Sequence, residues 1–270
     1  MHKILLLVTH GFPHHLLDFA NELCKEDPCK VTALFIDRLQ VTDTESYVFP
    51  SDIKATETDF TAGKEKEEEQ HFLSDRIQLF TDYCVSNNIS YAARTITGNF
   101  LENINDETAF ADYVLCDANL DLELFSMPNF ISSAACPVLL IPAATAFFDH
   151  VIFTFDGHMS SIHAMKQFSY LFSKFKNLQV SLVTIVPPHN AVMDYDTLVR
   201  EWITTHFPEA NIEILQGDVK EQLPAYINQF KNSLVVMGAF GRNALSKLFK
   251  ESLVPTILKT TKAPLFISHI

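Results

Sequence analysis

Short apolar runs alternate with segments of helical apolar spacing, and this alternation limits the possible folds of the chain more than any other feature. The first run, Ile4–Thr9, is continuously apolar, as expected for a strand buried on both faces, and apolar residues then recur at helical spacing up to Leu23. Further strand-like runs of the first half are Lys30–Asp37, Ser90–Thr97, Tyr113–Cys116 and Pro137–Ile141. Because helical segments and no hairpin signals separate these runs, they predict a parallel sheet with helices on both faces.

The second half of the chain repeats the order of the first. Its strand-like runs are Val151–Phe155, Val180–Val186, Ile212–Leu215, Leu234–Met237 and Pro264–Ser268. Landmark residues recur in matching places: Gly11 with Gly157, Gly98 with Gly217, and Pro128 and Pro137 with Pro255 and Pro264. Such self-similarity indicates a tandem duplication. We therefore predict an α/β protein of two doubly wound, Rossmann-like domains, residues 1–145 and 146–270, each with a five-stranded parallel sheet.

The last strand-like run of each half is expected to lie at the edge of its sheet. Pro137–Ile141 and Pro264–Ser268 are strongly apolar, and an open apolar edge strand promotes aggregation. Pairing the two runs would close both edges. We therefore predict that the two domains pack together as a pseudo-dimer within one chain. The sequence leaves a further homodimer of the tandem chain open.

Composition disfavours several classes of protein. Of 270 residues, 47% are apolar, which is enough for a buried core, and no apolar run approaches the length that crosses a bilayer. A formal charge of −13 disfavours binding to nucleic acid or to an anionic membrane, because both rely on Lys and Arg to neutralise phosphates. The cysteines stand at irregular spacings that suggest neither a disulfide framework nor a paired metal motif: Cys24, Cys29, Cys84, Cys116 and Cys136. A cytoplasmic location, in a reducing environment, is therefore expected.

The stretch Leu234–Ser252 carries the clearest candidate for binding chemistry. Its apolar run ends at Gly238, Gly241 follows, and the next residues have helical apolar spacing. In such a strand, turn and helix, glycines let the backbone turn tightly and expose amide groups to an anion, and the helix N-terminus favours the same guest. The spacing is neither the GxGxxG dinucleotide fingerprint nor the phosphate loop ending in Gly-Lys-Ser/Thr. On spacing alone, a phosphate-binding turn and a plain structural turn both stay open.

This stretch resembles the nucleotide loop of the universal stress protein family, which reads G-x2-G-x9-G followed by Ser or Thr. Gly238 and Gly241 match the first two glycines and Ser252 matches the hydroxyl residue, whereas Glu251 stands at the third glycine position. We call residues 238–252 the glycine loop. The family's usual ending, a helical segment followed by a strand entered through proline, is also present. The resemblance implies an adenine nucleotide alpha hydrolase-like fold and a site for ATP or AMP, and it leaves the participation of Mg²⁺ open.

Asp156 is the second functional candidate, because it directly follows the strand-like run Val151–Phe155. A side chain there projects into the crevice at the carboxyl edge of the sheet, where open α/β folds bind ligands. In the family the equivalent Asp contacts the adenine side of ATP. The resemblance therefore implies a nucleotide site made of Asp156, Ile185 on the next strand, Met237 and the glycine loop. The alternative interpretation is that Asp156 caps the helix that follows it.

The first half has lost these features. His10 occupies the position that corresponds to Asp156, and Asp117 occupies the position that corresponds to Gly238. The segment between Asp117 and the last strand-like run is also six residues shorter than its counterpart in the second half. A carboxylate at the phosphate position repels a triphosphate. We therefore expect no nucleotide in the first half.

Other chemistry has little support in the sequence. Histidines follow the first strand-like run of each half, but no HExxH or cysteine spacing accompanies them, so no metal site is predicted: His10, His14, His15, His158 and His163. Nucleophile-elbow, kinase and paired-carboxylate motifs are missing from the sequence, and we predict no catalytic residue. Slow ATP hydrolysis or self-phosphorylation would rest on the family resemblance alone.

The resemblance implies a stress-response protein whose second domain is a nucleotide-responsive binding module and whose first domain is a structural or regulatory partner. Glu251 adds a negative charge near the phosphate position, so we expect weak affinity for ATP and a relative preference for AMP. Two other classes stay open: a ligand-free structural or regulatory module in which the glycines are turn residues, and a nucleotidyl-transfer enzyme of another doubly wound family.

Overall fold

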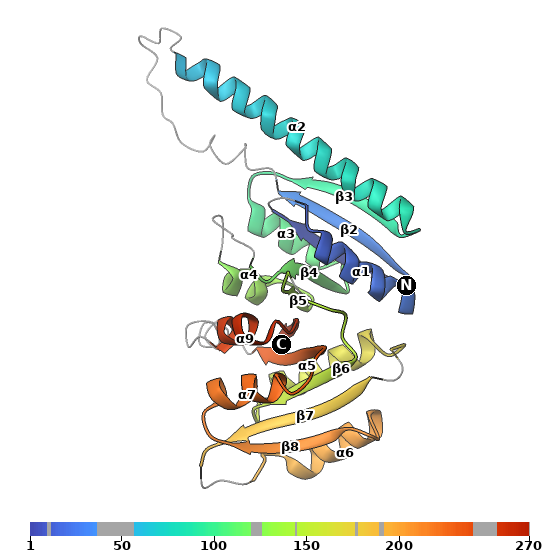
Figure 1. Cartoon of the computed structure of the whole chain (residues 1–270), viewed down its shortest axis with the longest axis vertical. Coiled ribbons are helices and arrows are strands. Elements are labelled where there is room, and N and C mark those ends of the chain that lie inside the picture. Colours follow the sequence, from blue (N-terminus) through green and yellow to red (C-terminus); the bar gives the residue numbers. More distant parts are fainter. Residues whose placement is uncertain are drawn as a thin grey trace.

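The structure, a computed structural model, places ten strands in one continuous sheet (Figure 1). It describes residues 1–9, 12–36, 57–119, 126–143, 145–175, 178–188, 192–239 and 253–269, with side chains omitted for residues 57–70. The strand order is β3-β2-β1-β4-β5-β10-β9-β6-β7-β8. Among the helices in these ranges, none is long and apolar enough to cross a membrane.

The first half forms one side of the sheet. Its elements are β1 (His2–Val8), α1 (His14–Glu26), β2 (Cys29–Ile36), α2 (Glu57–Ser86), β3 (Ser90–Ile96), α3 (Phe100–Thr108), β4 (Tyr113–Asp117), α4 (Met127–Ser133) and β5 (Val138–Ile141). The strands β2, β3, β4 and β5 all run parallel to β1, which lies between β2 and β4. The order β3-β2-β1-β4-β5 is that of a doubly wound sheet, as predicted.

The second half forms the other side with the same topology. Its elements are β6 (His150–Phe155), α5 (Met159–Leu171), β7 (Gln179–Val186), α6 (Asp196–His206), β8 (Asn211–Gln216), α7 (Val219–Ile227), β9 (Ser233–Ala239), α9 (Leu253–Thr261) and β10 (Leu265–His269). Strand β6 lies between β7 and β9, and all pairs within this half are parallel. The chain therefore changes direction across the sheet between β6 and β9, as it does between β1 and β4 in the first half.

The two halves join through their last strands. β5 and β10 pair in antiparallel fashion, with Leu139 opposite Phe266 at the centre of the contact. Both residues are fully buried, so the pairing removes two apolar edges from solvent. The predicted pseudo-dimer of two tandem doubly wound units is thus confirmed, and the junction lies at the middle of the molecule in Figure 1.

Apolar side chains of the strands alternate between two buried layers. Ile4 and Leu6 of β1 point to the layer covered by α1, α2, α5 and α6, whereas Leu5 and Leu7 point to the layer covered by α3, α4, α7 and α9. Each layer contains residues from both halves. Burial on both faces explains why the central strands read as continuous apolar runs rather than as alternating patterns.

Candidate functional site

Those sequence-predicted residues of the second half that the structure describes lie at the carboxyl ends of three neighbouring strands. Asp156 follows β6, Ile185 is the penultimate residue of β7, and Met237 and Gly238 stand near the end of β9. β6 pairs with both β7 and β9, so these three strand ends are adjacent. The point between β6 and β9 is also where the strand order reverses, which is the usual ligand crevice of an open α/β sheet. Gly241, Glu251 and Ser252 lie outside the described residues.

Asp156 already has partners within the chain. Its Oδ1 accepts hydrogen bonds from the backbone N–H of His158 at 3.1 Å and from the Ser161 hydroxyl at 3.0 Å. These contacts form a turn that leads into α5, whose N-cap residue is His158 rather than Asp156. The Asp156 side chain is still 62% exposed, and Oδ2 lies 3.5 Å from the His158 ring. One carboxylate oxygen therefore supports the helix start, while the other lies beside the His158 ring on a largely exposed side chain.

Gly238 is required by the packing of β9 against α5. A Cβ atom at this position would lie 2.2 Å from the carbonyl carbon of Ser160 and 2.3 Å from the backbone nitrogen of Ser161. No side chain fits there, because the neighbouring atoms are backbone atoms of the first helical turn and have no room to move aside. Close packing of α5 on β9 therefore explains the glycine at position 238 without any bound phosphate.

Ile185 and Met237 contribute an apolar wall beside these polar groups. Both belong to the buried layer that α7 and α9 cover, and Met237 is only 4% exposed. Ile185 is partly exposed at the end of its strand. At this edge, accessible apolar surface therefore comes from Ile185 rather than from Met237.

Asp194 is a residue of this edge that sequence reasoning missed. Gly157 has a positive φ of 82°, and a Cβ atom on it would lie 2.7 Å from the Asp194 carboxylate oxygen Oδ2. The connection between β7 and α6 therefore passes close to the turn after β6 and brings a second carboxylate to it. No local motif in the sequence marks Asp194.

The corresponding edge of the first half carries a contact between a carboxylate and a histidine instead. Asp117, at the end of β4, has its Oδ2 3.2 Å from Nε2 of His15 on α1, and its side chain also accepts a hydrogen bond from the backbone N–H of Asn119 at 2.7 Å. Burial raises the pKa of Asp117, but His15 and the Asn119 N–H outweigh that effect and the net shift is downwards. The carboxylate is therefore negatively charged at neutral pH. His10 lies outside the described residues.

Two further observations bear on other kinds of site. Within the described ranges, no group of three His, Cys, Asp or Glu side chains is arranged to hold a metal ion.

A hollow of about 990 Å³ lies at the opposite edge of the second half, where its lining includes His150, Ser181 and Phe230. Buried His150 shares a hydrogen bond of 2.9 Å with Ser181, and burial lowers its pKa. Asp156, Ile185, Met237 and Gly238, the predicted site residues within the described ranges, do not line this hollow.

Comparison with known proteins identifies the fold. No family model and no curated protein matches the sequence. A universal stress protein from Archaeoglobus fulgidus matches the structure with a TM-score of 0.71 at 12% identity, over 99% of this chain and 98% of that chain. A candidate universal stress protein from Pseudomonas aeruginosa matches with a TM-score of 0.58 at 11% identity, over 100% of this chain and 93% of that chain. A functionally unknown protein from the same species matches with a TM-score of 0.58 at 10% identity, over 100% of this chain and 92% of that chain. The chain therefore has, over its whole length, the tandem α/β fold seen in a universal stress protein.

Proposed function

We propose that this chain is a two-domain stress-response protein of the universal stress protein type, with domains at 1–145 and 146–270, whose second domain binds an adenine nucleotide. The observation that carries the proposal is the meeting of Asp156, Ile185 and Met237 at the strand-order reversal between β6 and β9. That position combines an exposed hydrogen-bond acceptor with an apolar surface, which is the combination that recognises a flat heterocycle with an amino group. A cytoplasmic location belongs to the same proposal.

Each group has a distinct role in the proposed complex. The Asp156 Oδ2 accepts a hydrogen bond from the exocyclic amino group of adenine, while its Oδ1 keeps the turn before α5 in place. The partly exposed Ile185 contacts the base, whereas the buried Met237 supports this edge from within the apolar layer. The ribose and phosphates extend over Gly238 towards the rest of the glycine loop, where family resemblance assigns Gly241 and Ser252 to the phosphates. Asp194 adds negative charge beside this turn, and family resemblance assigns Glu251 to the phosphate position, so a monophosphate is favoured over a triphosphate.

A ligand-free structural module is the second candidate, and two contacts favour it. Gly238 is needed for the approach of α5 to β9, and Asp156 is needed for the turn before α5. Both residues would thus be retained without any nucleotide. Binding measurements separate the two candidates directly.

The test is a calorimetric titration of AMP and ATP into the full chain and into Asp156→Asn. Asparagine keeps the acceptor oxygen for the turn but replaces the second carboxylate oxygen by an N–H₂ donor, so the variant should fold normally while losing the contact to adenine. We expect a single nucleotide per chain and a loss of about 1–3 kcal/mol of binding free energy in the variant.

The matched control is Asp117→Asn, which makes the same change at the corresponding edge of the first half. This variant should bind nucleotide as the parent does. Two equivalent sites per chain, or equal affinity for the parent and Asp156→Asn, would contradict the proposed site. A parent protein that binds neither nucleotide would favour the ligand-free module.

A further inference from the structure

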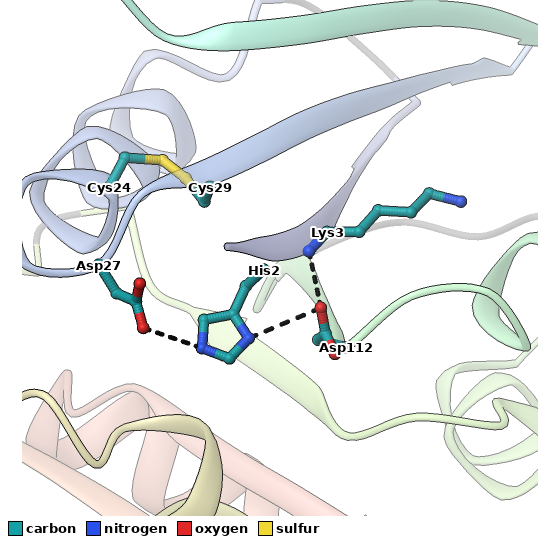
Figure 2. The surroundings of a disulfide bond; sticks show 6 residues. All are labelled: His2, Lys3, Cys24, Asp27, Cys29 and Asp112. Atoms are coloured by element: carbon teal, nitrogen blue, oxygen red, sulfur yellow. Dashed lines mark hydrogen bonds and ion pairs between the residues drawn. A yellow bond between two sulfur atoms is a disulfide. The ribbon is translucent and has the colours of Figure 1, made fainter.

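A disulfide lies where α1 turns into β2. Cys24 is near the end of α1, Cys29 is the first residue of β2, and their Cα atoms are 5.2 Å apart (Figure 2). The irregular cysteine spacing suggested no disulfide framework, so this bond corrects that expectation for one pair. The physical reason is the tight connection: α1 ends at Glu26 and the chain reverses within two residues, which brings the two side chains together.

The turn that this disulfide closes carries a buried acid. Asp27 has only 7% of its side chain exposed, and its Oδ2 lies 3.1 Å from Nε2 of His2. The other ring nitrogen of His2 is 3.6 Å from Asp112, which also accepts a hydrogen bond of 2.7 Å from the backbone N–H of Lys3. The close view of Figure 2 shows His2 held between the two carboxylates.

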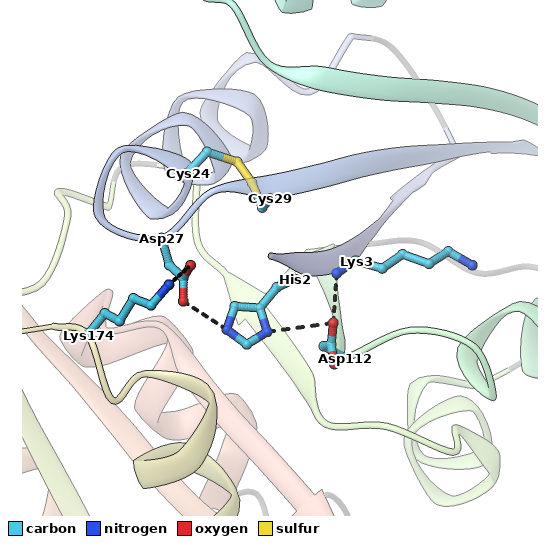
Figure 3. A network of polar contacts seen from close by, with 7 residues as sticks. All are labelled: His2, Lys3, Cys24, Asp27, Cys29, Asp112 and Lys174. Atoms are coloured by element: carbon cyan, nitrogen blue, oxygen red, sulfur yellow. Dashed lines mark hydrogen bonds and ion pairs between the residues drawn. A yellow bond between two sulfur atoms is a disulfide. The ribbon is translucent and has the colours of Figure 1, made fainter.

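Asp27 also connects the two halves of the molecule. Its Oδ1 accepts a hydrogen bond of 2.7 Å from Nζ of Lys174, which belongs to the connection between α5 and β7 (Figure 3). The Lys174 side chain is 56% exposed, so its charge reaches the buried acid from the solvent side. The contact lies at the amino ends of the strands, whereas the proposed nucleotide site lies at their carboxyl ends.

We propose that Cys24 and Cys29 form a redox site whose state controls the contact between Asp27 and Lys174. Cys24 is partly exposed, whereas Cys29 is buried with 6% exposure, so an incoming thiolate reaches the Cys24 sulfur first. In a reducing compartment, a protein disulfide is typically transient and redox-sensing rather than permanent. This inference does not depend on nucleotide binding.

The reaction is thiol–disulfide exchange with a dithiol reductant. One thiolate of the reductant attacks Sγ of Cys24, the bond to Cys29 breaks, and Cys29 leaves as a thiolate that takes up a proton. The second thiolate of the reductant then displaces Cys24 from the mixed disulfide. The protein gains two electrons and two protons, and the reductant becomes a disulfide. Oxidation by a disulfide reagent runs the same steps backwards.

Reduction is expected to loosen the turn that carries Asp27. Without the covalent link, the turn keeps the backbone hydrogen bonds from Asp27 N–H to Leu23 and from His2 N–H to Pro28. These bonds hold the backbone but leave the Asp27 carboxylate more freedom to move away from Lys174. The segment around Lys174, from Phe172 to Phe175, then loses a fixed partner in the first half.

The experiment compares the oxidised and reduced forms of the full chain in buffers of oxidised or reduced dithiothreitol. Alkylation under denaturing conditions checks the redox state: the oxidised form should label only Cys84, Cys116 and Cys136, and the reduced form should also label the redox pair. Hydrogen exchange measured by mass spectrometry should then be severalfold faster in the reduced form, both in the turn around Asp27 and in the segment around Lys174.

Two variants decide whether the ion pair transmits the effect. In Lys174→Ala, reduction should still accelerate exchange around Asp27 but should no longer affect the segment around position 174. Lys166→Ala removes an exposed lysine from α5 and should behave as the parent does. Three results would overturn the proposal: labelling of all five cysteines in the protein treated with oxidised dithiothreitol, a segment around Lys174 that does not respond to reduction in the parent, or an unchanged response in Lys174→Ala.

Discussion

Asp156 and Thr154 both make side-chain hydrogen bonds within the protein. Asp156 accepts hydrogen bonds from His158 and Ser161, and the Thr154 hydroxyl donates to the carbonyl of Val236 at 3.0 Å. Threonine supplies a hydrogen bond between β6 and β9 that proline cannot make. The type of a single residue therefore does not show whether the residue binds a ligand or stabilises the fold.

Glu251 is the residue whose charge should decide between AMP and ATP. If its side chain points towards the phosphates, a like charge about 4 Å away costs on the order of 4 kcal/mol at an effective dielectric near 20. We therefore expect Glu251→Gly to strengthen binding of ATP more than binding of AMP. Calorimetric titration of both nucleotides measures the difference. Unchanged affinity for both would mean that the glycine loop is a structural turn and helix.

Helix α5 is the element that organises the second half. Its first turn contacts β9 at Gly238, and its far end contacts β10, where the rings of Phe168 and Phe266 meet edge to face with centroids 5.5 Å apart. The stacked pair of Phe168 and Phe172 continues this aromatic packing beyond the helix end. The position of α5 therefore depends on the glycine at position 238 near its first turn and on large aromatic side chains near its far end.

The contact between α5 and β9 predicts a large cost for Gly238→Ala. The added methyl group would overlap the Ser160 and Ser161 backbone, so α5 must shift, and we expect a loss of about 1–3 kcal/mol in the free energy of unfolding. Urea denaturation measures this loss. In Gly98→Ala the new methyl group meets no atom within 4 Å, so backbone strain at its φ of 70° is the expected cost.

A Gly238→Ala protein as stable as the parent would show that α5 adjusts freely. The same overlap makes the larger Gly238→Val change unsuitable as a test of phosphate binding. Lost nucleotide binding in that variant would report lost packing as readily as a lost amide contact.

One ten-stranded sheet runs through both halves, which join at its centre through β5 and β10. Side chains from both halves also pack against each other beside this junction. Phe147 and Phe148 lie on the connection between the halves, next to Phe19 of α1 and Phe175 after α5. The ion pair of Asp27 and Lys174 stands on the same side of the junction. Apolar burial supplies the large free energy of the junction, and the ion pair adds a directional contact to it.

The ion pair predicts a pH-dependent contribution to stability. Burial raises the pKa of Asp27, but Lys174, His2 and the N-terminal amino group outweigh it, so the pKa is lowered on folding. A group with a lowered folded pKa stabilises the fold above its unfolded pKa of about 3.9 and loses this contribution as the pH falls below that value. The measured quantity is the free energy of unfolding of the parent minus that of Asp27→Asn.

As the pH falls below about 4, this difference should shrink, because Asp27 becomes protonated. Asp112, which lies on the other side of His2, is unchanged in both proteins, so the comparison isolates Asp27. A difference that grows as the pH falls below about 4 would contradict the lowered pKa of Asp27. Lys174→Ala should reduce the difference throughout.

The sequence by itself determined the element order, the parallel sheets, the tandem repeat and the pairing of Pro137–Ile141 with Pro264–Ser268. These features depend on apolar patterns within short segments, and a strongly apolar edge has few ways to be buried. The same local patterns marked Asp156 and Gly238 as conspicuous positions, although they did not show how each is used.

Only the tertiary structure decided which side chains from distant segments meet. Gly238 faces the backbone of Ser160, Asp194 lies beside Gly157, and Lys174 reaches Asp27 across 147 positions of the chain. The Cys24–Cys29 bond depends on where α1 stops and how sharply the chain turns into β2. Such contacts leave no periodic pattern in the sequence, because each depends on how whole helices and strands pack rather than on the conformation of neighbouring residues.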